Sequence, residues 1–117
     1  MKYLCLVYGE EEKIRAMDDD ECMVYDAGLR QDGRCLASES LQQVRTASTV
    51  RVREGRISVT DGPFAETKEQ LAGFYLIEAR DRDEAIDIAS KIPPARVGCI
   101  EVRPVRELIS TAGERRA

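Results

Sequence analysis

The sequence of 117 residues contains no histidine and no tryptophan, and its eight glycines are isolated from one another. Without histidine, the chain cannot form a Ser-His-Asp triad, a Cys-His pair or a zinc site with a histidine ligand. Any general base must then be an aspartate, glutamate, tyrosine, lysine or cysteine thiolate. The glycine spacing provides no phosphate-binding loop. We therefore expect neither a metal site nor a cofactor.

Aromatic residues are scarce, at 5% of the chain, and acidic residues outnumber basic ones by 22 to 18. Proteins that stack single-stranded bases need several exposed aromatic side chains beside basic ones, and binders of the phosphate backbone usually carry a positive excess. We therefore expect no nucleic-acid partner. The alternative is an anion or nucleic-acid site at Arg51, Arg53 and Arg56, which the interspersed acidic residues disfavour.

The four cysteines, Cys5, Cys22, Cys35 and Cys99, are scattered and form no C-x-x-C motif. A tetrathiolate zinc site is therefore not expected, and the pattern predicts buried free thiols. The first apolar run, Tyr3–Tyr8, spans about six residues, which is too short for a signal peptide or a membrane span. We expect a cytoplasmic protein without a membrane partner.

Short apolar runs and alternating patterns predict strands, and apolar stripes at helical spacing predict two helices. In chain order these are strand Tyr3–Tyr8, helix Glu21–Asp32, strand Cys35–Leu41, strand Leu71–Ala79, a helix between Asp81 and Pro93, and strand Cys99–Arg103.

Both predicted helices carry start signals and end signals, and Pro93-Pro94 ends the second one. The acidic run 18–20 supplies N-caps and complements the helix dipole, while Gly33 is a natural stop. Asp81 and Glu84 form a capping-box pattern before the second helix. The first helix has two apolar stripes, one of Cys22, Tyr25 and Leu29 and the other of Val24, Ala27 and Gly28. A glycine inside a helix costs up to about 1 kcal/mol, so we expect Gly28 to allow a close approach to the sheet.

The segment Thr49–Thr60 predicts a β-hairpin, because apolar and polar residues alternate on both sides of Glu54-Gly55. A two-residue turn at this point places all four apolar side chains on one face and the arginines on the other. The predicted cross-strand pairs are Val50 with Val59 and Val52 with Ile57.

Without this hairpin, the order of elements is the split β-α-β arrangement, so we predict an α+β, ferredoxin-like domain with an inserted β-hairpin. The domain spans residues 1–105, and residues 106–117 form a charged C-terminal tail. On the last strand, Cys99, Glu101 and Arg103 alternate with Ile100 and Val102, so the sheet face without helices is partly apolar. A homodimer that stacks sheet on sheet would cover it.

The segment 59–71 joins two predicted strands by a longer loop than a tight turn requires, with the apolar Phe64 among charged residues. Loops of this kind often line binding sites. Two interpretations remain open. In one, Asp61, Phe64, Glu66 and Lys68 belong to a ligand site. In the other, Asp61 caps the turn, Phe64 fills the core, and Glu66 and Lys68 pair at the surface.

The motif D-G-P-F at 61–64, its continuation over 65–69, and the segments Gly73–Ile77 and Ile100–Pro104 resemble the DGPF family of YCII-related proteins. The resemblance spans nearly the whole chain. It implies a dimeric α/β barrel with a cavity near the dimer interface. Some members are encoded beside extracytoplasmic-function sigma factors, which implies a regulatory context.

The resemblance also concerns catalysis, because a His–Asp pair is the proposed active site of better-understood YCII-related relatives, with the His on the first helix. This chain has no histidine, and Glu21, Cys22 and Tyr25 stand near that helical position. Asp61 corresponds only loosely to the Asp of the pair.

Two functions follow from these residues. In the first, the domain binds an unknown small molecule through Tyr25, Phe64, Glu66, Lys68 and Tyr75. The alternative is a small isomerase or lyase in which Asp61, desolvated beside Phe64, transfers a proton while Tyr25 and Tyr75 donate to an oxyanion. For either function, we predict that Phe64 and Tyr75 line one cavity, with Asp61, Glu66 and Lys68 at its rim.

Overall fold

The computed structural model describes residues 1–111 and 113, which contain six strands and three α-helices. In chain order these are β1 (Lys2–Gly9), α1 (Glu11–Arg15), α2 (Asp19–Gln31), β2 (Cys35–Ser40), β3 (Ser48–Arg53), β4 (Arg56–Asp61), β5 (Gln70–Glu78), α3 (Arg82–Ser90) and β6 (Cys99–Pro104). Two short 3-10 helices, Val44–Thr46 and Pro93–Arg96, lie before β3 and after α3. The charged tail predicted over 106–117 falls partly on residues 112 and 114–117, which lie outside the described residues.

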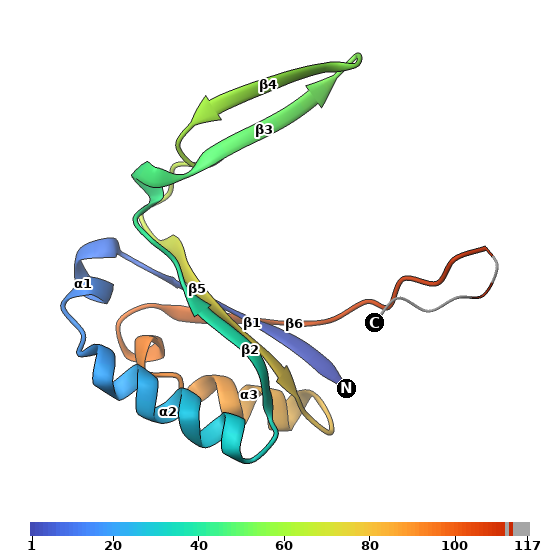
Figure 1. Cartoon of the computed structure of the whole chain (residues 1–117). Helices are drawn as coiled ribbons and strands as arrows, with labels where there is room; N and C mark the ends of the chain where they lie inside the picture. Colours follow the sequence, from blue (N-terminus) through green and yellow to red (C-terminus); the bar gives the residue numbers. More distant parts are fainter. Residues whose placement is uncertain (112, 114–117) are drawn as a thin grey trace.

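Four of the strands form one antiparallel sheet in the order β2-β5-β1-β6, and α2 and α3 lie on one face of it (Figure 1). The strands β3 and β4 form a separate two-stranded sheet. This strand order arises when two β-α-β units interleave. The described chain is therefore an α+β domain compatible with a ferredoxin-like fold.

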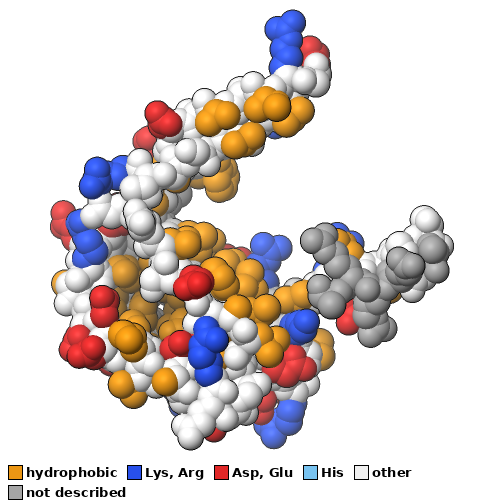
Figure 2. Space-filling model, in the orientation of Figure 1, with side chains coloured by type: hydrophobic (Ala, Val, Ile, Leu, Met, Phe, Trp, Pro, Cys, Tyr) orange, Lys and Arg blue, Asp and Glu red, His pale blue; other side chains and the backbone are white. Residues whose placement is uncertain are grey.

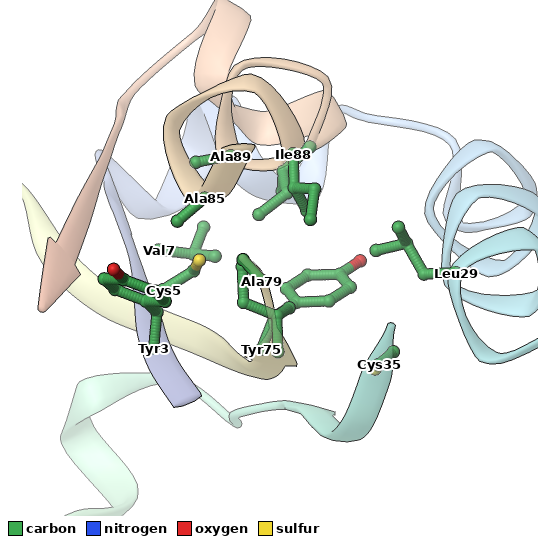
Figure 3. Packing of buried hydrophobic residues seen from close by; sticks show 12 residues of the cluster. Tyr3, Cys5, Val7, Leu29, Cys35, Tyr75, Ala79, Ala85, Ile88 and Ala89 are labelled. Carbon is green, nitrogen blue, oxygen red and sulfur yellow. The ribbon is translucent and has the colours of Figure 1, made fainter. Parts of the chain in front are cut away.

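The hydrophobic core lies between this sheet and the two helices. Alternation along β1 directs Tyr3, Cys5 and Val7 to the helix side, where all three are buried. Their side chains face those of α3, including Ile88 (Figure 3). Ile77 from β5 is fully buried in the same cluster.

None of the helices in the described part of the chain lies on the other face of the sheet. Its centre is apolar, because Leu4 and Leu6 of β1 lie beside Leu76 and Phe74 of β5, and all four side chains are only partly buried. We call this surface, defined by Leu4, Leu6, Phe74 and Leu76, the open face. Figure 2 shows hydrophobic side chains gathered on the concave side of the molecule, over the sheet and along β3 and β4.

Local side-chain signals fix the helix ends as predicted. The Asp18 carboxylate accepts a hydrogen bond from the Asp20 amide at 3.0 Å, and the Asp81 carboxylate accepts one from the Glu84 amide at 2.9 Å. The Glu84 side chain reaches back to the amide of Arg80 rather than to that of Asp81. After α2, Gly33 has a φ of +73°, a left-handed conformation that glycine adopts without strain.

Gly28 does not have the predicted role. A Cβ atom built on this residue would meet no heavy atom within 4 Å, so the sheet does not approach α2 at this position. The reason is the helical rotation, which turns this part of α2 to solvent: Val24 on the same stripe is 73% exposed. Of the two predicted apolar stripes, only that of Cys22, Tyr25 and Leu29 faces the core.

The strands β3 and β4 pair in the register calculated from the sequence, with Val50 opposite Val59 and Val52 opposite Ile57. Glu54 and Gly55 both have positive φ angles, +51° and +73°, as a two-residue turn of the mirror-image type requires. We call this hairpin, Ser48–Asp61, the arm. It projects away from the four-stranded sheet (Figure 1).

Candidate functional site

A cavity of about 440 Å³ lies between α2 and the helix-covered side of the sheet, near the start of the helix. Its apolar lining includes Val7, Ile14, Met17, Met23 and Tyr75, and its polar lining includes Asp19, Cys22, Asp26, Ser38, Glu39 and Ser40. A volume in this range is typical of small-molecule sites. We call it the α2 cavity.

Gly73 contributes to the α2 cavity and also determines how closely two strands approach. A Cβ atom at this position would lie 2.7 Å from the backbone oxygen of Glu39, so any larger residue would push β2 away from β5. The glycine therefore keeps the edge strand β2, with Ser38 and Ser40, close beside β5 at the cavity wall.

Asp26 in the α2 cavity accepts hydrogen bonds from three side chains. Its Oδ1 atom accepts hydrogen bonds from the hydroxyl of Ser38 and, at 3.5 Å, from the thiol of Cys35. Its Oδ2 atom accepts one from Nε of Arg30, one helical turn away, at 3.0 Å. Arg30 also donates to the Ser38 hydroxyl at 3.0 Å, which closes the network. Helix α2 and strand β2 thus hold this carboxylate between them.

The network sets the charge of this carboxylate. Burial by itself would raise the pKa of Asp26, but the hydrogen bonds from Ser38 and Arg30, together with the charge of Arg30, outweigh burial and lower the pKa below its ordinary value. Asp26 is therefore ionised at neutral pH. It can accept a hydrogen bond from a ligand, but it is a weak proton acceptor in catalysis.

Two tyrosines pack edge to face beside the cavity. The ring centroids of Tyr25 and Tyr75 are 6.4 Å apart with an interplanar angle of 61°. The Tyr25 hydroxyl donates to the backbone oxygen of Ile88 at 2.6 Å, so this donor is already engaged. Burial raises the pKa of Tyr25 to about 12 and also raises the pKa of Tyr75. Both phenols are protonated at neutral pH.

The cysteines differ in exposure, which corrects the prediction that all four are buried: Cys5 and Cys35 are buried, Cys22 is half-buried and Cys99 is exposed. Cys22 lines the α2 cavity, where burial, followed by the nearby Asp19 and Glu21, raises the pKa of its thiol. The Cys22 thiol is therefore protonated and weakly nucleophilic at neutral pH.

Among residues 1–111 and 113, no cluster of three or more Cys, Asp or Glu is placed to hold a metal ion.

The predicted common cavity of Phe64 and Tyr75 does not form within one chain. Phe64 is 81% exposed and does not line the α2 cavity, whereas Tyr75 does. The physical reason is the path of the chain: β4 runs back from the tip of the arm to its base (Figure 1), and Phe64 lies in the loop between β4 and β5 with its ring exposed to solvent. The alternative that Phe64 fills the core is wrong for the same reason.

The other predicted residues of this loop also lie outside the α2 cavity. Asp61 is exposed at the end of β4, and the turn after it is held by the Gly62 amide, which donates to Ala47 at 2.7 Å. Lys68 lies 3.8 Å from Glu10 and borders a separate charged recess of about 250 Å³. Glu66 is exposed. A role for Asp61, Phe64, Glu66 or Lys68 in ligand contact stays a prediction.

Sequence reasoning missed Asp26 and Ser38 as site residues, although a signal was present. Asp26 lies four residues after Cys22, so it shares the core side of the helix, where a charged residue is unusual. Ser38 and Ser40 alternate along β2 on the same face, and that face is the one turned to the helix. An acid on the core side of the helix, together with two serines on the helix-facing side of the strand, would have indicated a polar cavity wall.

No helix in the described part of the chain is both long and apolar enough to cross a lipid bilayer.

The family model of the YCII-related domain matches residues 1–109. The chain is also 39% identical over 114 residues to an uncharacterized protein of Rhizobium meliloti (strain 1021), a match that covers 90% of this chain and 92% of that protein. The chain therefore belongs to the family of YCII-related domain proteins, as its D-G-P-F motif predicts.

Proposed function

We propose that the protein binds a small molecule in the α2 cavity and acts as a homodimer. The observation that carries the proposal is a half-open pocket in which an ionised carboxylate, Asp26, and the Ser38 hydroxyl meet an apolar wall. Such a combination of shape, apolar surface and a few fixed polar groups is typical of ligand sites.

The charge of the lining favours one class of ligand. Among the described residues around the cavity, the acidic side chains are Asp19 and Asp26, and neither lysine nor arginine lines it, although Arg30 pairs with Asp26. An anionic ligand would meet like charges, whereas an amine or alcohol can donate to Asp26. We therefore assign the site to a neutral or cationic hydrogen-bond donor with an apolar or aromatic body.

Binding is favoured over proton transfer. Asp61 is exposed and lies outside the α2 cavity, so it lacks the desolvation that the isomerase or lyase hypothesis requires. Inside the cavity, Asp26 has a lowered pKa and Cys22 a raised one, and neither shift suits a general base or a nucleophile at neutral pH. A ligand-binding domain also fits the regulatory, sigma-factor-linked context that the family resemblance implies.

A matched series of probes tests this proposal. Benzylamine, benzyl alcohol and benzoate share one ring and differ in charge, so titration of isotope-labelled protein with each, followed by amide NMR, separates shape from charge. We expect benzylamine to shift the amides of residues 22–26 and 38–40 in a saturable manner, and benzoate to leave them unchanged.

Two variants locate the binding. Asp26→Asn should weaken the binding of benzylamine about tenfold, because a charge-assisted hydrogen bond is lost. Asp87→Asn is the matched control, since Asp87 is an exposed acid on α3 whose partner is Lys91. Failure of all three probes to bind overturns the small-molecule function, and binding of benzoate alone overturns the assigned ligand class.

A further inference from the structure

We propose that helix α1 couples the α2 cavity to the arm, so that a ligand in the cavity and the position of the arm influence each other. This coupling rests on the proposed function, because it regulates ligand binding in that same cavity. It uses contacts within one chain, so it is independent of how two copies associate.

One side of α1 forms part of the cavity wall. Ile14 of α1 and Met17, two residues after the helix, both line the α2 cavity. Ile14 also packs tightly on the end of β1, because a Cβ atom built on Gly9 would lie only 2.7 Å from the Cδ1 atom of Ile14. A movement of α1 therefore displaces Ile14 and changes the apolar wall that a ligand meets.

The start of α1 contacts the chain at the base of the arm. Oε2 of Glu11 accepts a hydrogen bond from the amide of Val44 at 2.8 Å, in a partly buried position. Val44 begins the 3-10 helix that directly precedes β3. On the other side of the base, Glu10 lies 3.8 Å from Lys68, in the loop between β4 and β5. Figure 1 shows α1 at the end of the sheet from which the arm projects.

Hydrogen bonds continue from Val44 into the arm. The amide of Ala47 donates to the backbone oxygen of Val44 at 3.0 Å, and the backbone oxygen of Ala47 accepts from the Gly62 amide at 2.7 Å. The Thr49 hydroxyl donates to the backbone oxygen of Gly62 at 2.9 Å. A shift of Val44 is therefore transmitted through contiguous bonds to the start of β3 and to the residue after β4.

Helix α1 is held in place by few contacts. It has five residues, all of them described, and none is buried. A helix of this length is not stable alone in water, so its position depends on the Glu11–Val44 hydrogen bond and on the packing of Ile14. Elements held this weakly are the ones that open locally and that ligands reposition.

These contacts determine the sign of the coupling. A ligand in the α2 cavity meets Ile14 when α1 lies against the sheet, and in that arrangement Glu11 also accepts from Val44. Ligand binding should therefore stabilise the Glu11–Val44 hydrogen bond. By thermodynamic linkage, this hydrogen bond should strengthen ligand binding by the same factor.

Variants at both ends of the hydrogen bond test the coupling. Glu11→Ala removes the acceptor. Val44→Pro removes the amide donor at the first position of a helix, where proline is tolerated after the extended Gln43. In the benzylamine titration, each variant should bind about fivefold more weakly than the wild type. The double variant should bind no more weakly than either single one, because both substitutions remove the same bond.

Matched controls keep the hydrogen bond. Glu12→Ala removes an exposed acid from the same helical turn, and Val44→Ala retains the amide, so both should bind benzylamine like the wild type. If amide spectra show that Val44→Pro unfolds, Glu11→Gln replaces it. This variant keeps an oxygen acceptor and should restore the affinity that Glu11→Ala loses.

A measurement without ligand separates the coupling from the proposed function. Ile14→Ala removes the contact that holds α1 against β1, so hydrogen exchange of the Val44 amide should become about fivefold faster. Met23→Ala changes the same cavity from α2 and should leave exchange at Val44 unchanged.

The outcomes distinguish the two proposals. Equal affinities of Glu11→Ala and Glu12→Ala, or additive losses in the double variant, overturn the coupling and leave the small-molecule function. If no probe binds, the proposed function fails, and exchange at Val44 decides the coupling alone. Exchange at Val44 that does not respond to Ile14→Ala overturns it.

Discussion

The four-stranded sheet and the arm have similar alternating apolar patterns but different environments. On the helix side, Ile77 is fully buried beneath α2 and α3, whereas on the arm Ile57 is 72% exposed. Both residues stand in strands with alternating side chains, and alternation always creates two faces. The comparison shows that a strand pattern specifies which side chains share a face, while the cover for that face must come from elsewhere in the chain or from another copy.

The largest effect should come from truncating matched isoleucines in these two environments. Ile77→Ala should lower the free energy of unfolding by about 2–5 kcal/mol, because it removes buried methylene groups and leaves a cavity. Ile57→Ala should change it by less than about 0.5 kcal/mol in dilute solution. Urea unfolding followed by circular dichroism measures both, and equal losses would contradict the distinction between the two regions.

The helices that cover the core depend on their caps. Asp81→Ala removes the acceptor of the Glu84 amide and should destabilise the fold by about 1 kcal/mol. Asp83→Ala, in the first turn of α3 but not at the cap position, should cost only a few tenths of this amount. Thermal unfolding measures the stability of the two variants. A larger loss of stability for Asp83→Ala than for Asp81→Ala would show that the Asp81 cap does not fix the start of α3.

Two glycines, Gly28 within α2 and Gly33 just after it, give effects of opposite sign. Gly28→Ala places a methyl group in open space within a helix and should stabilise the protein by about 0.5–1 kcal/mol. Gly33→Ala forces a side chain into a φ of +73° and should destabilise it by about 1 kcal/mol. Denaturant midpoints report both signs, and destabilisation by Gly28→Ala would reveal a contact of α2 that a second copy provides.

The smallest effect concerns pH. Because the pKa of Asp26 is lowered in the folded protein, its ionised form stabilises the fold at pH values above the ordinary carboxyl pKa of about 3.9. This contribution is lost as the pH falls through the lower pKa of the folded state. The stability advantage of the wild type over Asp26→Asn should therefore shrink on acidification. An advantage that grows as the pH falls would contradict the assigned direction.

Local chemistry explains what could be predicted from the sequence. The turn at Glu54-Gly55, the caps at Asp18 and Asp81 and the two-residue periodicity depend on near neighbours, and the structure contains each of them. The position of Phe64 could not be derived, because it depends on the direction in which the chain leaves the base of the arm after β4. That direction is a tertiary property, and it separates Phe64 from Tyr75.

In the candidate site, too, some features could be predicted from the sequence and others depend on tertiary packing. Tyr25 and Tyr75 were identified from the sequence and do lie together. Asp26 and Ser38 come from different elements, and their hydrogen bond arises only when α2 packs against β2. No pattern along the chain contains that pairing.

Amide hydrogen exchange at two protein concentrations tests most directly whether one region folds within the chain and the other by association. We predict that the amides of Cys5 and Ile77 are equally protected at both concentrations, because their strand pairing lies inside one chain. The amides of Val50, Val52, Ile57 and Val59 that take part in strand pairing should exchange rapidly in dilute solution and become protected as the concentration rises. Arm amides whose protection does not change with concentration would contradict the account.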